Sequence, residues 1–91
     1  MTIEIIHERG AQRFVADIEG QLCVLEYRLS ASTMTITHTG VPAALGGRGI
    51  AAELTRAALS AARSEGWKVI PACSYAAGFM QKQAEYRDLI A

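Results

Sequence analysis

The stretch Pro42-Ala43-Ala44-Leu45-Gly46-Gly47-Arg48-Gly49-Ile50-Ala51 decides how this chain folds, because it joins an extended region to an alanine-rich helix. Gly46, Gly47 and Gly49 leave the backbone without side chains where that helix begins. The first N–H groups of a helix lack partners within the helix and carry a partial positive charge. The turn therefore predicts a seat for a phosphate or diphosphate. A tight strand-to-helix turn that binds nothing is the alternative.

The region before this turn has the alternating pattern of β-strands. Apolar and polar side chains alternate with a period of two, as in a sheet with one buried face. Glu19-Gly20-Gln21 and Ser30-Ala31-Ser32 are short turn sequences within it. We expect an antiparallel meander, with Met34, Ile36 and His38 on one face of its last strand. The four predicted strands cover 3–8, 13–19, 22–29 and 33–39.

The pattern after the turn changes to the period of an α-helix. Ile50, Leu54 and Ala58 recur at helical spacing within a helix predicted over 48–65. Gly66 is the type of residue that follows a helix end. The many alanines of this helix would allow it to approach a sheet closely.

A short apolar strand predicted over 67–72 follows this helix, and a second helix is predicted over 74–83. A strand, helix and strand joined in this way form a right-handed crossover, so 67–72 should lie parallel to 33–39. Pro71 has no N–H for a sheet, so the two parallel strands should separate near it. This order predicts an α+β fold, an antiparallel β-meander followed by a βαβ crossover, in one domain over 1–91.

The gap between the two parallel strands is a predicted ligand site. A ligand entering it would lie between His38 and Cys73, with its phosphates at Gly47. Cys73 begins a helix, whose dipole favours a thiolate there. The alternatives are purely structural. Cys73 would pack as a small buried hydrophobic residue, and His38 would lie at the rim of the core.

The composition excludes several classes of function. The 91 residues include nine basic and nine acidic side chains, so neither nucleic acid nor an anionic membrane is an expected partner. No apolar run approaches the ~20 residues that span a bilayer. Residues 1–8 carry acids where a signal peptide carries bases, and the two cysteines fit reduced thiols, so we expect a cytoplasmic protein. Cys23, Cys73, His7 and His38 lack the spacing of a zinc site, so no metal is expected.

The order of elements and the glycine turn resemble the GNAT superfamily of N-acetyltransferases. Their motif is Arg/Gln-x-x-Gly-x-Gly/Ala, and residues 46–51 match its glycine and its final small residue. Over nearly the whole chain, four blocks resemble the small YjdJ-type GNAT-like proteins in order and spacing. These blocks are Thr37-His38-Thr39, Gly47-Arg48-Gly49-Ile50-Ala51, Pro71-Ala72-Cys73-Ser74-Tyr75 and Glu85-Tyr86-Arg87-Asp88-Leu89. The resemblance implies a minimal GNAT-like fold.

The chain departs from these patterns at several positions. Gly46 stands where the superfamily motif has Arg or Gln, which leaves backbone amides and Arg48 to meet the phosphates. Gly40 stands where YjdJ-type proteins have an acid, and Lys82-Gln83-Ala84-Glu85-Tyr86 replaces their Lys-His-Pro-Glu-Tyr run. Further strands of larger GNAT enzymes have no counterpart here. We therefore expect an acceptor side that is open or completed by a partner, such as a homodimer.

The resemblance also implies which residues bind acetyl-CoA or coenzyme A. Main-chain amides of the glycine turn would hold the diphosphate, and an N–H near Thr39 to Val41 would polarise the thioester carbonyl. Tyr75 and Tyr86 are either donors to the coenzyme or half-buried anchors. The implied coenzyme-binding residues are Thr39, Val41, Gly46, Gly47, Arg48, Gly49, Ile50, Ala51, Ser74, Tyr75 and Tyr86.

The implied reaction is acetyl transfer from acetyl-CoA to an amine, which must lose a proton before it attacks. His38 is the candidate base, directly or through water, because imidazole exchanges protons near neutral pH. Cys73 is either a nucleophile that carries the acyl group or a thiol beside the coenzyme sulfur. Ser74, Tyr75 or Tyr86 would return a proton to the departing thiolate. The sequence leaves the identity of the acceptor amine open, with polyamines, peptides, lysine and small-molecule amines as the candidates.

Other classes of function compete with an enzyme. The turn also fits the G-x-G-x-x-G/A dinucleotide fingerprint, but four strands precede it and 67–72 lacks the expected acid. A non-catalytic coenzyme A or acyl-CoA-binding module is the main alternative, and an interaction domain on a GNAT scaffold is another. Cys23 is expected in the core, and His7 is expected in solvent.

Overall fold

The computed structural model describes residues 3–91, which form one sheet, two α-helices and three short 3-10 helices. The strands are β1 (Ile6–Glu8), β2 (Arg13–Ile18), β3 (Gln21–Ser30), β4 (Thr33–Gly40) and β5 (Lys68–Pro71). The helices are η1 (Arg9–Ala11), η2 (Ala43–Leu45), α1 (Ile50–Glu65), α2 (Ser74–Lys82) and η3 (Ala84–Leu89).

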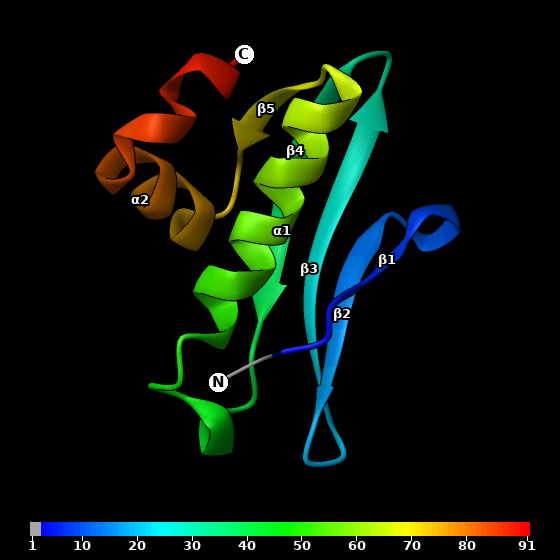
Figure 1. Cartoon of the computed structure of the whole chain (residues 1–91), viewed down its shortest axis with the longest axis vertical. Helices are drawn as coiled ribbons and strands as arrows, with labels where there is room; N and C mark the ends of the chain where they lie inside the picture. The colour runs from blue at the N-terminus through cyan, green and yellow to red at the C-terminus, as the bar shows by residue number, and fades with distance from the viewer. Residues whose placement is uncertain (1–2) are drawn as a thin grey trace.

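The sheet has the strand order β1-β2-β3-β4-β5, and its first four strands are antiparallel (Figure 1). Glu19 and Gly20 connect β2 to β3 with φ of 55° and 78°, the left-handed pair of a tight hairpin turn. β5 returns parallel to β4 after α1. This arrangement confirms the predicted meander, the crossover and the α+β fold class.

Helix α1 packs across the sheet because its apolar stripe faces β2 to β5. Leu54, Ala58 and Ala62 are completely buried in this stripe. The helix ends at Gly66, whose φ of 77° lets its N–H bond to the Arg63 carbonyl, while the Trp67 N–H bonds to the Ala62 carbonyl. The prediction that Gly66 ends this helix is confirmed.

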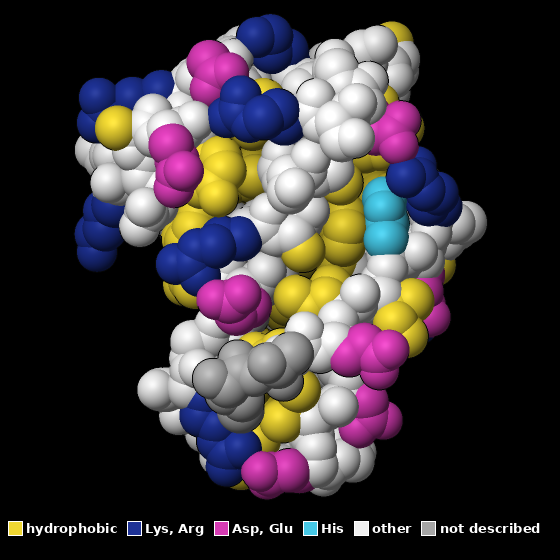
Figure 2. All heavy atoms as spheres, viewed as in Figure 1, with side chains coloured by type: hydrophobic (Ala, Val, Ile, Leu, Met, Phe, Trp, Pro, Cys, Tyr) yellow, Lys and Arg dark blue, Asp and Glu magenta, His cyan; other side chains and the backbone are white. Residues whose placement is uncertain are grey.

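The core lies on the face of the sheet that carries α1 and α2. Leu25, Met34, Ile36 and Val69 are fully buried against the two helices. Seen from the α1 side, apolar side chains surface in the middle of the molecule, with charged side chains largely around them (Figure 2). The opposite sheet face, called the open face below, exposes 50% of Leu22 and 44% of Ile70.

A β-bulge in β4 reverses the predicted orientation of His38. Ile36 pairs with Tyr27, but His38 pairs with Glu26, so Thr37 is the extra residue between them. Ile36 and Tyr27 face the core, whereas Glu26 and His38 are exposed on the open face. The expectation that His38 shares a face with Ile36 is therefore wrong.

The first strand is shorter than predicted, and His7 within it is not solvated as expected. β1 begins at Ile6, and residues 9–11 form η1. The His7 ring stacks on Phe14 with centroids 4.0 Å apart, and Nε2 shares a 2.6 Å hydrogen bond with the Tyr27 hydroxyl. Burial lowers the pKa of His7 and raises that of Tyr27. An aromatic cluster therefore anchors β1.

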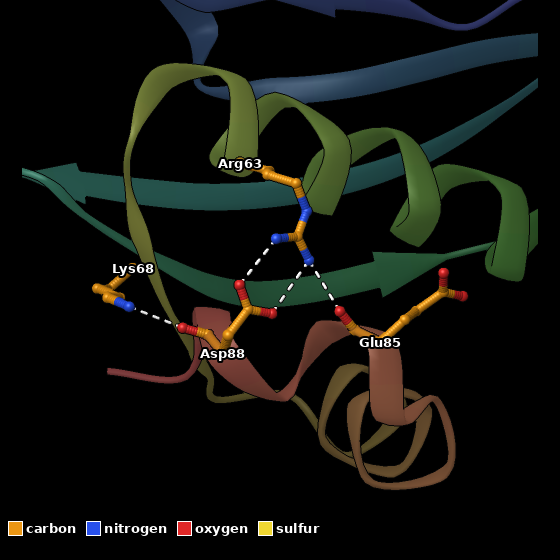
Figure 3. Close-up of polar contacts among 4 residues, drawn as sticks. All are labelled: Arg63, Lys68, Glu85 and Asp88. Carbon is orange, nitrogen blue, oxygen red and sulfur yellow. Dashed lines mark hydrogen bonds and ion pairs between the residues drawn. The ribbon is translucent and has the colours of Figure 1, made fainter.

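The C-terminal segment forms η3, which periodicity does not predict, and polar contacts hold it to the rest of the fold (Figure 3). The Arg63 guanidinium donates to both carboxylate oxygens of Asp88, at 2.8 and 3.1 Å, and to the Glu85 carbonyl. The Lys68 ammonium donates to the Asp88 carbonyl. These contacts join η3 to α1 and β5, and hydrogen bonding from Arg63 lowers the pKa of Asp88.

Among residues 3–91, no helix is both long enough and apolar enough to cross a bilayer.

Candidate functional site

The glycine turn presents an uncapped helix end with open space beside it. Gly47 and Gly49 have φ of 80° and 78°, and a Cβ added at either would meet no atom within 4 Å. Gly49 is the N-cap of α1, and no side chain caps the helix there. The N–H groups of the first helical turn thus remain available to an external acceptor.

A hollow of about 250 Å³ lies against this helix end. It extends from the turn toward the sheet, because Val41, which follows β4 directly, and Tyr75 from α2 form part of its wall. Seven predicted site residues meet here, and Leu45 and Ala52, which the sequence analysis missed, complete the lining. The predicted residues are Val41, Gly46, Gly47, Gly49, Ile50, Ala51 and Tyr75.

Arg48 points away from this hollow in the structure. Its guanidinium donates to the Glu19 carboxylate in the β2–β3 turn, at 2.7 Å. This hydrogen bond lowers the pKa of Glu19. Both side chains are exposed, so the contact is weak and a stronger anion can compete for Arg48.

The parallel strands separate where the sequence predicts it. Pro71 pairs with Ile36 at the end of the ladder, and the N–H groups of both Ala72 and Cys73 then converge on the Ile36 carbonyl. The segment of β4 after Ile36 keeps its pairing with β3 but has no β5 residue beside it in the register. A gap therefore opens between Thr37–Gly40 and the start of α2.

Cys73 lies at this gap. Its Sγ is 3.6 Å from the Thr39 hydroxyl and accepts the Ala76 N–H at 3.4 Å, so Cys73 is the N-cap of α2. The side chain is partly exposed, while Cys23 is buried in the core as predicted. The N-cap contact holds the thiol at the positive end of the helix dipole, beside the diverging strands.

His38 approaches the gap from the open face rather than from the helix side. A Cβ added at Gly40 would lie 2.9 Å from His38 Nε2, so the ring folds over Gly40. The absence of a side chain at Gly40 thus makes room for the imidazole.

Tyr86 and Ser74 lie apart from the hollow at the glycine turn. Tyr86 belongs to η3, and its ring packs on Phe79 with centroids 5.9 Å apart. Phe79 also stacks on Tyr75, so the three rings form a row along α2. Ser74 lines a different depression on α2, together with Tyr75.

Comparison with known proteins identifies the group to which this fold belongs. The family model described as GCN5-related N-acetyl-transferase matches residues 13–89. The chain belongs to the GCN5-related N-acetyltransferase family. A solution structure of a GCN5-like protein from Staphylococcus aureus, proposed to be an N-acetyltransferase, is 31% identical, with a TM-score of 0.77 over 97% of this chain and 87% of that one. No curated protein sequence matches the chain.

Membership in the GCN5-related N-acetyltransferase family confirms the predicted GNAT resemblance, fold and enzyme class. The family uses acetyl-CoA as its acyl donor, and the residues around the glycine turn fit such a ligand. A diphosphate followed by a narrow acyl-bearing arm suits this site, which has an uncapped helix N-terminus, two glycines with positive φ and a hollow walled by Val41 and Tyr75.

Proposed function

We propose that this chain, as one domain over 1–91, transfers an acetyl group from acetyl-CoA to an amine. The observation that carries the proposal is the hollow that connects the open helix end at Gly49 with Val41 and Tyr75, next to the gap at Cys73. When bound there, acetyl-CoA supplies an activated acyl group as a thioester.

The proposed coenzyme contacts come from main-chain groups of the glycine turn. The N–H groups from Gly47 to Ala52 would donate to diphosphate oxygens, and the dipole of α1 would favour their negative charge. Arg48 would join them if it left Glu19. The end of β4 at Thr39 and Gly40, or Val41 directly after it, would donate an N–H to the thioester carbonyl oxygen.

His38 is the proposed base for the acceptor. A primary amine has a pKa of ~10.4, so its deprotonation at pH 7 costs about 4–5 kcal/mol. The imidazole at the open face can take this proton directly or through one water, which makes the amine a nucleophile. The acceptor would then enter from the open face, while the coenzyme occupies the α1 side.

Cys73 is the proposed acyl-bearing nucleophile. The Cys73 thiolate would bond to the acetyl carbon as the C–S bond of the thioester breaks and its electron pair goes to the departing sulfur. A nearby donor such as Tyr75 would protonate that departing thiolate, which gives the free thiol. The amine would next displace the Cys73 sulfur, and His38 would take the amine proton. Exchange between two thiols is nearly balanced in energy, so this route carries little thermodynamic cost.

The test combines binding, turnover and acyl labelling. Coenzyme A binding is measured by calorimetry, and thiol release from acetyl-CoA is followed with a panel of diamines, polyamines, lysine and peptide N-termini. We expect coenzyme A to bind and acetyl-CoA to release its thiol with at least one amine. We also expect the mass of an acetyl group to be added to the peptide that contains Cys73. Binding without release for every amine would indicate a non-catalytic coenzyme module, and no binding would indicate an interaction domain.

A further inference from the structure

A hollow of about 310 Å³ lies at the end of α1 that is remote from the glycine turn. Trp67, which follows the end of α1, forms one of its walls, and Tyr27 of β3 forms another. Helix α1 has 16 residues, so it is about 24 Å long, and it runs from the glycine turn toward the other end of the molecule (Figure 1). A ligand in this hollow, called the distal hollow below, would therefore lie far from the diphosphate seat. The other lining residues are Arg9, Gly10, Gln12 and Leu29.

Two aromatic rings and an exposed leucine form the apolar part of the distal hollow. The rings of Tyr27 and Trp67 lie with their centroids 6.2 Å apart and their planes inclined by 45°. The Tyr27 ring is held in place, because it is almost completely buried and its hydroxyl is hydrogen-bonded to His7. Leu29 is 38% exposed, and a Cβ built on Gly10 would meet no atom within 4 Å. A flat apolar group therefore has fixed walls to pack on and open space beside them.

Gln12 brings a free hydrogen-bond donor to the distal hollow. Its side-chain carbonyl accepts the Leu29 N–H at 2.6 Å, and its main-chain carbonyl accepts the Tyr27 N–H at 3.0 Å. These bonds hold the amide in one orientation. No acceptor within residues 3–91 is bonded to the side-chain NH₂ of Gln12, so both of its N–H groups are available to a ligand.

Arg9 adds a positive charge to the distal hollow. Of the residues described, it is the one charged side chain in the lining. Its guanidinium donates to the Glu65 carboxylate at 2.7 Å and keeps further N–H groups for another acceptor. Because 62% of the Arg9 side chain is exposed, its pair with Glu65 is weak and a ligand carboxylate can share the guanidinium. A cation beside fixed aromatic walls favours a ligand that combines a ring with a negative charge.

We propose that the distal hollow binds a small aromatic carboxylate. Its ring would lie against Trp67 and Leu29, and its carboxylate would accept hydrogen bonds from Arg9 and Gln12. This site is separate from the proposed acetyl transfer, because the distal hollow shares no lining residue with the hollow at the glycine turn. The chain would thus hold two different ligands at the two ends of α1.

An NMR titration of the ¹⁵N-labelled chain with phenylacetate tests this site. Trp67 is the only tryptophan of the chain, so its indole N–H gives a single signal. We expect saturable shifts of this signal and of the Gln12 side-chain amide. Phenylacetamide, which has the same ring without the charge, should bind about fivefold more weakly, as for the loss of one exposed charge pair. Acetate, which has the charge without the ring, should cause no saturable shift.

Two pairs of variants assign the contacts. Arg9→Gln should abolish the preference for phenylacetate over phenylacetamide, whereas Arg56→Gln, which breaks the exposed pair with Glu53, should preserve it. Leu29→Glu replaces an apolar contact with a negative charge and should weaken phenylacetate binding about tenfold. Leu22→Glu makes the same change on the open face and should bind normally. Both leucines are exposed, so both variants should fold.

Shifts that spare Trp67 and Gln12, or no saturable shift with phenylacetate, would overturn the proposed site. A preference for phenylacetate that survives in Arg9→Gln would also overturn it. Coenzyme A binding is measured on the same samples and should be equal in all four variants. Failure of the distal site therefore leaves the proposed function intact, and failure of coenzyme A binding leaves the distal site intact.

Discussion

The Thr39 hydroxyl lies 3.6 Å from the Cys73 thiol, across the point where β4 and β5 diverge. The same thiol accepts the Ala76 N–H and so serves as the N-cap of α2. One side chain therefore begins a helix and faces the gap that the parallel strands leave open. The N-cap contact with the Ala76 N–H therefore also fixes where the thiol lies beside this gap.

Replacing Cys73 with serine separates these two roles. Serine is a strong N-cap residue, so Cys73→Ser should retain the melting temperature of the wild type. It should lose the acetyl label that mass spectrometry detects after incubation with acetyl-CoA, because a hydroxyl is a far weaker nucleophile than a thiolate.

The matched control is Cys23→Ala, which removes the buried thiol of β3 and should keep the label. Full turnover by Cys73→Ser would contradict a covalent route and leave direct transfer to the amine.

A carboxylate introduced at Ala52 tests the diphosphate seat. Ala52→Asp places a negative charge in the first turn of α1, where it stabilises the helix but repels a phosphate. We expect unchanged or higher thermal stability together with at least tenfold weaker binding of coenzyme A by calorimetry. Ser60→Asp adds the same charge in the middle of α1 and should bind normally. Equal affinity of both variants would count against the seat.

Gly40 is predicted to position the proposed base. Gly40→Ala introduces a Cβ where His38 Nε2 now lies 2.9 Å away, so the imidazole must move. We expect a lower kcat with an unchanged KM for acetyl-CoA. His38→Gln should lower kcat further, by about 10²–10⁴-fold, as for the loss of a general base. Normal kcat in both variants would exclude His38 from proton transfer.

The sequence predicts the fold well because each element has a local signal. Alternation identifies β2, β3 and β4, the helical stripe identifies α1, and Pro71 identifies the point of separation. These signals are sufficient because the connections are short and the crossover has one favoured hand.

The errors occur where non-local contacts decide the structure. Alternation through Thr33–Thr39 continues unbroken, so the bulge at Thr37 leaves no trace in the pattern and His38 is assigned to the wrong face. η3 is held by Arg63 from α1, a contact that periodicity cannot indicate. Likewise, only the folded sheet brings His7 to Tyr27.

The partly buried position of His7 makes stability depend on pH. Burial is the main cause of its lowered pKa, with Arg9 adding to it and Glu65 opposing it. The unfolded chain then binds more protons than the folded chain below the ordinary pKa of 6.5, so the free energy of unfolding should fall as pH decreases from about 7.

Urea denaturation between pH 5.5 and 7.5 measures this slope. His7→Phe should flatten it, because the ring still stacks on Phe14 but no longer titrates. Tyr27→Phe should cost about 1 kcal/mol at neutral pH by removing the hydrogen bond. A slope that is unchanged in His7→Phe would show that other groups cause it.

The Arg63 contacts should govern the opening of η3. Arg63→Gln removes the donors to Asp88 and Glu85, so amide hydrogen exchange over 84–91 should accelerate while exchange in β2 and β3 stays the same. Arg9→Gln breaks another exposed ion pair, the one with Glu65, and serves as the control. Equal protection of 84–91 in both variants would mean that apolar packing alone holds η3.

The most direct test of the central claim is a coenzyme A titration of the ¹⁵N-labelled chain, with backbone amides followed by NMR. The diphosphate seat predicts that the largest shifts occur at Gly47, Gly49, Ile50 and Ala51, with smaller shifts at Val41 and Tyr75. Saturable shifts elsewhere that leave these four amides unmoved would contradict it.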